Sequence, residues 1–322
     1  MSYMKETTVR KTTLHPSFRP FRDYLVTMVP LVLLATYVYG LRVVVMLAIA
    51  TVTSSLCDLL VAALRGRHIR LSDISSFCFA WTVTLMLPVS VSYSVVIFAV
   101  CATLLLGKHP FGGFGNYPLH PAAFGFALTA ISFSDQVFMY PLKPARLGLG
   151  WKLDIALYQS PAGILHDGGV PLVDRTDLIL GNFTGAVGGT FCLIIFACLF
   201  LLIMHRAVCW QIPVFYLATC AAWAFFLPRI PAAKEDSVLF EMFCCGIPYA
   251  ASYLVAEVTL IPKNPIARCL YGIVAGVLTM LISTYGIYEI GAPFAVLLAT
   301  PIGYWLDRLL SKRREEVKNG QS

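Results

Sequence analysis

The sequence has few charged residues. Asp, Glu, Lys and Arg make up 13% of its 322 positions, against roughly 25% in a typical soluble domain. Hydrophobic residues make up 58%, and the mean hydropathy is +0.76. This balance excludes an ordinary soluble domain and predicts a polytopic membrane protein in contact with the lipid bilayer. Residues 1–22 are polar and basic, without the apolar core of a cleavable signal, so the first apolar run is expected to remain as a membrane anchor.

The motifs of soluble enzymes are also missing. The chain has no Gly-x-Ser-x-Gly elbow and no phosphate-binding P-loop. Its ten cysteines include no Cys-x-x-Cys pair, which favours small buried side chains over an iron–sulfur cluster. No two histidines are three or four residues apart, so no metal site is predicted. The chain is not expected to be an enzyme by itself.

Long apolar runs are abundant and predict ten membrane spans. These lie near residues 24–40, 42–64, 73–88, 91–107, 119–134, 178–204, 209–227, 238–258, 266–284 and 289–307. The predicted fold class is therefore an all-α polytopic membrane protein.

The longest polar connection divides the spans into two groups of five. The predicted organisation is an N-terminal tail (1–23), a first half (24–134), a loop (135–177), a second half (178–307) and a basic C-terminal tail (308–322). Because five is odd, two similar halves would have opposite topology, as in inverted-repeat transporters with broken helices. The fifth run of each half begins close to a proline, which is consistent with such a repeat.

Positive charge predicts the orientation. Most of the 24 Lys and Arg residues fall in the two tails and in the loops on the same side as the tails. The positive-inside rule then places both termini in the cytoplasm and the 135–177 loop outside. The net charge of +7 is explained in this way, and no nucleic-acid partner is expected.

Residues 107–125 form a glycine-rich segment between two apolar runs. Gly112, Gly113 and Gly115 permit backbone conformations closed to other residues, and three prolines prevent a continuous helix. At membrane depth such a backbone is tolerated only where it is buried in protein or lines a cavity. We expect a broken helix, with His120 in a capping turn. Lys108 is either an attractor for an anionic ligand or a charge that orients the chain.

Two acidic residues lie inside or near the end of apolar runs, where a charge is costly and often functional. Asp58 lies within the second run and Glu257 near the end of the eighth. Both are candidates for ion or proton coupling. The alternatives are a hydrogen-bonded acid that packs helices together at Asp58, and a side chain that reaches the interface at Glu257. Glu289 lies at the start of a run, where solvation is expected to suffice.

Several motifs, in a shared order and spacing, resemble one family over nearly the whole chain. They are His15-Pro16, Asp73-Ile74-Ser75-Ser76 with Leu85-Met86-Leu87-Pro88, Gly107-Lys108 with Phe111-Gly112-Gly113-Phe114-Gly115, Pro121-Ala122, Asp177-Leu178 with Gly181-Asn182, Gly185 and Gly188, Trp210-Gln211-Ile212-Pro213, Glu257 with Pro262, and Tyr271-Gly272 with Phe294-Ala295-Val296. The family is that of RnfD, a membrane component of Rnf electron-transport complexes, and of the related NqrB, a membrane component of the sodium-pumping NADH:quinone reductase.

The resemblance implies an integral subunit of a redox-driven Na⁺ or H⁺ translocase. It implies partner subunits of the Rnf A, B, C, E and G types, and the cell membrane of a bacterium. It also implies flavin mononucleotide (FMN) esterified to a threonine of the outer loop. In this sequence Gly163 stands at that position, within Ser160-Pro161-Ala162-Gly163, and has no hydroxyl to esterify. Covalent attachment is therefore not expected there, and non-covalent flavin or no flavin are left open.

A flat flavin ring needs a slot between helices, and glycines would provide it. The predicted cofactor-binding residues are Gly112, Gly113, Gly115, Gly185 and Gly188. The leading interpretation is a subunit that takes part in flavin-mediated electron transfer coupled to ion translocation. The alternatives are a small-solute channel or transporter of similar architecture without a redox role, and a structural scaffold within the complex.

Overall fold

The computed structural model describes residues 18–66, 73–143, 147–151, 153, 155–231 and 233–319, without the side chains of 18, 19 and 312–319. The described chain is helical and contains no strand, only one isolated bridge between Tyr140 and Tyr158. The all-α polytopic prediction is confirmed. Within the described ranges, four helices are long and apolar enough to cross a membrane, and the shorter helices 75–86, 121–132, 192–204 and 211–226 are also apolar.

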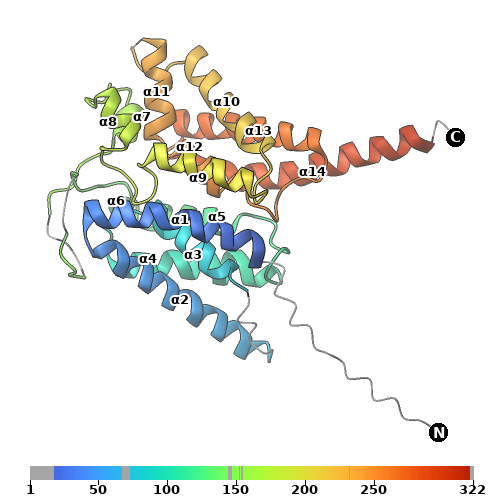
Figure 1. Ribbon diagram of the computed structural model, residues 1–322, viewed down its shortest axis with the longest axis horizontal. Coiled ribbons are helices and arrows are strands. Elements are labelled where there is room, and N and C mark those ends of the chain that lie inside the picture. Colours follow the sequence, from blue (N-terminus) through green and yellow to red (C-terminus); the bar gives the residue numbers. More distant parts are fainter. Residues whose placement is uncertain are drawn as a thin grey trace, which may run out of the picture.

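The helices fall into two groups (Figure 1). The first contains α1 (Phe18–Tyr39), α2 (Arg42–Leu64), α3 (Ser75–Met86), α4 (Tyr93–Cys101), η1 (Ala102–Lys108), η2 (His109–Phe111), α5 (Pro121–Ser132) and α6 (Ser134–Val137). Next come the short helices α7 (Pro161–His166) and α8 (Arg175–Leu180). The second group contains α9 (Cys192–Met204), α10 (Gln211–Phe226), α11 (Lys234–Cys244), α12 (Ile247–Tyr253), α13 (Pro265–Tyr285) and α14 (Ala292–Asn319).

Packing is similar within the two groups. In the first, α2 packs against α3 and α4, and in the second, α10 packs against α11 and α13. The groups meet where α1 packs against α9 and where α5 packs against α14. Both the repeated five-helix unit and the inverted relation between the halves stay predictions.

Two predicted spans are divided. The 178–204 run separates into α8 and α9, because Gly181 turns the chain with φ of +80°. Residues 181–191 then cross the end of α3, where the amides of Val187 and Gly188 donate to the carbonyls of Leu87 and Leu85, at 3.0 and 2.8 Å. The 238–258 run is divided between α11 and α12 at Gly246 (φ +65°). Non-helical backbone therefore lies between the two helix groups, as expected only where protein surrounds it.

Arg42 joins the loop after α6 to the first helix group through hydrogen bonds. Its buried guanidinium donates to the carbonyls of Val89 and Val91, both at 2.8 Å, and of Gly150 at 2.5 Å. It also lies over the ring of Tyr93, 4.6 Å from the centroid. Because a guanidinium carries five donors in a rigid fork, this one side chain joins α2 to the segment 89–91 and to the loop around Gly150.

Candidate functional site

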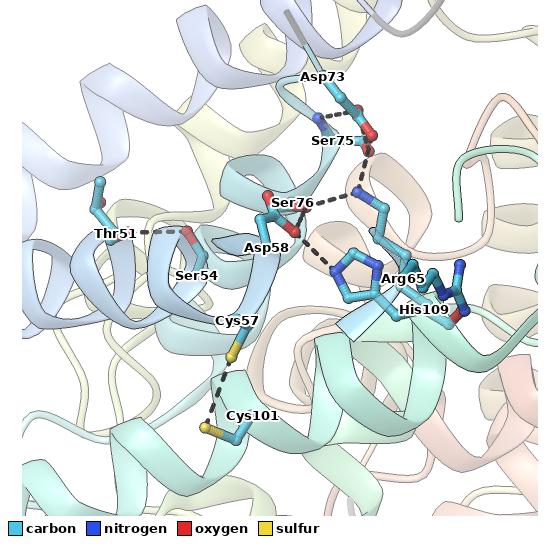
Figure 2. Close-up of polar contacts among 11 residues, drawn as sticks. Thr51, Ser54, Cys57, Asp58, Arg65, Asp73, Ser75, Ser76, Cys101 and His109 are labelled. Atoms are coloured by element: carbon cyan, nitrogen blue, oxygen red, sulfur yellow. Dashed lines mark hydrogen bonds and ion pairs between the residues drawn. The ribbon is translucent and has the colours of Figure 1, made fainter. Parts of the chain in front are cut away.

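Asp58 lies on α2 at the centre of a polar network (Figure 2). Its Oδ1 accepts a hydrogen bond from Ser76 Oγ at 2.9 Å and lies 2.7 Å from Nε2 of His109. The Asp58 side chain is 24% exposed. The acid therefore joins α2 to the start of α3 and to the glycine-rich segment, and it packs helices while remaining accessible.

Lys108 completes this network. Its side chain is 1% exposed, and Nζ donates to Ser76 Oγ at 2.6 Å and to Asp73 Oδ2 at 3.2 Å. Ser76 thus accepts from Lys108 and donates to Asp58, which links the lysine to both acids. The structure places Lys108 inside the protein rather than at a lipid interface. Its charge therefore stabilises the neighbouring acids, in addition to any effect on the orientation of the chain in the membrane.

The backbone of the glycine-rich segment presents Lys108 and His109 to these acids. The last turns of the α4 helix widen into the π-helical η1, a feature frequent at functional sites. Gly107 then passes close to Pro121, since an added Cβ would lie 3.1 Å from the proline Cα. Arg65 donates to the carbonyl of His109 from the end of α2. The segment is therefore packed into the protein at its two ends, at 107–108 and at Tyr117 and His120, whereas its middle at 110–112 and 115–116 is exposed.

Glu257 follows α12 and is 1% exposed. The Tyr117 hydroxyl donates to its Oε1 at 3.2 Å, and Thr259 Oγ lies 2.6 Å from Oε2. No ion pair reaches this carboxyl from the residues that the structure describes. Glu257 does not extend to the interface, because it is buried and held by the hydroxyl groups of Tyr117 and Thr259 and by the backbone amides of Thr259 and Leu260.

The glycine-rich segment contacts both candidate acids. Lys108 and His109 reach the Asp58 network, and Tyr117, eight positions later, reaches Glu257. The ring of Phe79 on α3 packs edge-on against Tyr117 with a centroid distance of 5.6 Å. The predicted coupling residues thus belong to one region, around the segment between η2 and α5. The start of α1 and the end of α2 lie toward the same side of the molecule as the end of α14 (Figure 1).

His120 has the capping role that the sequence predicts. Its Nδ1 accepts from the amide of Ala123 at 3.2 Å, at the start of α5. The ring is fully buried and packs edge-on against Phe79 at 5.6 Å. His120 is therefore a structural element next to the coupling region.

The five predicted cofactor-binding glycines lie in two different surroundings. Gly112, Gly113 and Gly115 follow η2 and all have positive φ, from +78° to +108°. Gly188 instead lies against Leu85, whose Cβ would be 2.8 Å from an added Cβ, and Gly185 lies against the methyl group of Thr190. No hydrogen bond or ring contact between the described residues joins the two sets, so a shared flavin slot stays a prediction.

Gly163 lies in α7, and its open side faces a carboxyl group. An added Cβ would lie 2.4 Å from Oε2 of Glu289 and 2.6 Å from Cγ of Gln159. Glu289 is only 6% exposed, so the expectation that solvent accommodates it is wrong. Residue 163 has no hydroxyl and no room for a larger side chain, and a phosphate ester there would meet a buried acid. Covalent FMN does not fit this position.

These features define a class: a multi-pass helical membrane protein with one buried and one half-buried acid in contact with a broken-helix segment. The chain matches the model of the NQR2, RnfD, RnfE family over residues 15–315. It therefore belongs to that family.

Three relatives are named as the D-type component of an ion-translocating oxidoreductase complex. The protein of Pseudomonas aeruginosa (strain UCBPP-PA14) is 29% identical over 287 residues, covering 84% of this chain and 83% of its own. That of Shewanella denitrificans is 27% identical, covering 89% and 90%. That of Mannheimia succiniciproducens is 24% identical, covering 85% and 87%.

Proposed function

We propose that this chain is an integral membrane subunit of an Rnf-type complex that couples electron transfer to Na⁺ or H⁺ translocation. Family membership and the names of its full-length relatives support the proposal. The partners are the other subunits of the complex, of the A, B, C, E and G types. The complex lies in the cell membrane of a bacterium, with both termini of this chain in the cytoplasm.

The observation that carries the role in ion coupling is the contact of one broken-helix segment with both candidate acids. Asp58 has His109 and, through Ser76, Lys108 nearby, whereas Glu257 has hydroxyl and backbone amide partners but no cation among the described residues. A carboxylate buried without a cation gains most from binding one. Movement of residues 107–125 would change the surroundings of both acids together. Glu257 is therefore the proposed cation-binding group, and the Asp58 network is the proposed sensor of that movement.

A flavin in the complex would supply one- and two-electron transfer. Because residue 163 does not fit an ester to FMN, a flavin held by this chain is proposed to be non-covalent, against the predicted glycines. In-gel fluorescence after denaturation tests this point. The 35.4-kDa band is expected to be dark, and native flavin absorbance is expected to disappear on denaturation and filtration. A fluorescent band would contradict the proposal.

Ion transport in vesicles that contain the purified whole complex tests the function. Glu257→Gln and Asp58→Asn are expected to slow donor-driven ion uptake about tenfold or more, since each removes a charge from the coupling region. Asp135→Asn, an exposed acid in α6, is the matched control and is expected to leave the rate unchanged. Unchanged transport in both variants would refute the coupling role. Uptake that needs no electron donor would instead indicate a solute transporter without a redox role.

A further inference from the structure

Glu289 lies between α13 and α14, in a part of the molecule that the proposed coupling region does not include. Its Oε1 accepts from the Tyr140 hydroxyl and from Ser160 Oγ, both at 2.9 Å. No hydrogen bond from the described residues reaches Oε2, which faces the open side of Gly163. One oxygen of a carboxyl that is more than nine-tenths buried is thus fixed, and the other is left available.

A small cavity adjoins this carboxyl. It has a volume of about 20 Å³ and is lined in part by Tyr140, Ser160, Gly185, Thr190 and Glu289. A cavity of this size holds about one water molecule or one bare ion. The glycine at 163 keeps Oε2 free, since any side chain there would collide with it.

No positive group balances Glu289 within the described chain. The titratable groups around it are the phenol of Tyr140, the carboxyl of Asp167, the thiols of Cys244 and Cys245 and the imidazole of His166 on α7. The His166 ring lies with Nδ1 3.0 Å from the carbonyl oxygen of Ser283, and no hydrogen bond or ion pair among the described residues joins it to Glu289.

The basic groups at the same end of the molecule are engaged elsewhere. Lys143 donates to Gly181 O at 2.8 Å and Thr190 Oγ at 2.6 Å, and Arg229 is paired with Glu241. Among the residues that the structure describes, no ion pair reaches Glu289. An isolated buried carboxylate costs several kcal/mol unless a cation or proton neutralises it.

We propose that Glu289, Tyr140 and Ser160 form a binding site for one small monovalent cation, Na⁺ or a proton, at the end of the molecule opposite the chain termini. Oε2 is the binding atom, and the two hydroxyl groups hold Oε1 and fix the carboxyl. The proposal does not rest on the role of the chain in electron transfer, because binding is measured directly.

The experiment uses the full-length chain in lipid nanodiscs and has two arms. In the first, equilibrium binding of ²²Na⁺ is measured. In the second, infrared difference spectra between pH values of roughly 5 and 9, the range that buried carboxyl groups reach, detect the C=O stretch of a protonated acid. Each arm compares the wild type with Glu289→Gln, Tyr140→Phe and the control Asp135→Asn. Thermal unfolding confirms that each variant is folded.

Glu289→Gln is expected to abolish the stoichiometric Na⁺ or the titrating band, and Asp135→Asn to keep it. Tyr140→Phe removes one donor to the carboxylate. If the ligand is a proton, this variant is expected to strengthen proton binding by about tenfold, because a lost hydrogen bond to the charged form disfavours that form. If the ligand is Na⁺, it is expected to weaken binding. A folded wild type with neither signal, or signals that are unchanged in both Glu289→Gln and Tyr140→Phe, would overturn the proposal. Binding without any donor-driven transport would contradict only the proposed function.

Discussion

Two polar clusters of this molecule treat charge in opposite ways: the Asp58 network near the chain termini, called the paired end, and the surroundings of Glu289 and Lys143, called the unpaired end. The nearby Arg229–Glu241 ion pair does not include either of the last two residues. Near the chain termini, Lys108 is joined to Asp73 directly and to Asp58 through Ser76, and His109 lies against the same Asp58. At the other end, Glu289 has hydroxyl partners only, and Lys143 has a carbonyl, a hydroxyl and aromatic rings but no carboxylate among the described residues. Opposite charges that are paired keep one protonation state, whereas unpaired ones exchange ions or protons readily.

The largest expected effect is at the paired end. Lys108→Met is expected to lower the free energy of unfolding by about 3 kcal/mol, because it leaves a carboxylate without its buried cation. The measurement is reversible unfolding in mixed detergent micelles. Lys263→Met, at an exposed lysine, is the control and is expected to change little. Equal stabilities of the two variants would mean that the Lys108 pair contributes nothing.

The second prediction concerns the space at the unpaired end. Gly163→Ala is expected to destabilise the protein by about 2 kcal/mol, because its methyl group collides with Glu289 and Gln159. Gly148→Ala is the matched control, since no atom lies within 4 Å of its added Cβ. Thermal unfolding of both variants decides the point. A stable Gly163→Ala variant would show that Glu289 can move away from residue 163.

The third prediction concerns Lys143 and the pH dependence of the free energy of unfolding. Burial lowers the pKa of Lys143 from 10.5 to about 7, so above pH 7 the folded state binds fewer protons than the unfolded state. The stabilising contribution of deprotonation therefore rises with pH between these two values. From pH 7 to 8 the wild type is expected to gain about 1 kcal/mol relative to Lys143→Met. Unfolding at both pH values measures this gain, and the Lys263→Met control is expected to keep it. A parallel pH dependence of wild type and Lys143→Met would contradict the assignment.

The smallest effect is expected at the link within the paired end. Ser76→Ala removes the hydroxyl between Lys108 and Asp58, but Lys108 keeps Asp73 and Asp58 keeps His109. The expected loss is about 0.5–1 kcal/mol, the usual net value of a hydrogen bond. Ser55→Ala, at an exposed serine of α2, is the control in the same unfolding experiment. A loss as large as that of Lys108→Met would show that Ser76 organises the whole network.

The sequence by itself determined the class of protein, the approximate position of the apolar runs and the break around residues 107–125, because hydropathy, glycine and proline act locally along the chain. It also identified Asp58 and Glu257 as unusual acids. Only the tertiary structure decided the partners of these acids and the burial of Glu289, which lies 149 and 129 positions from Tyr140 and Ser160 in the chain. No local signal distinguishes Glu289 from a solvated acid at a helix end. Its surroundings are built by segments remote in sequence, and burial and charge pairing depend on those neighbours rather than on the residue itself.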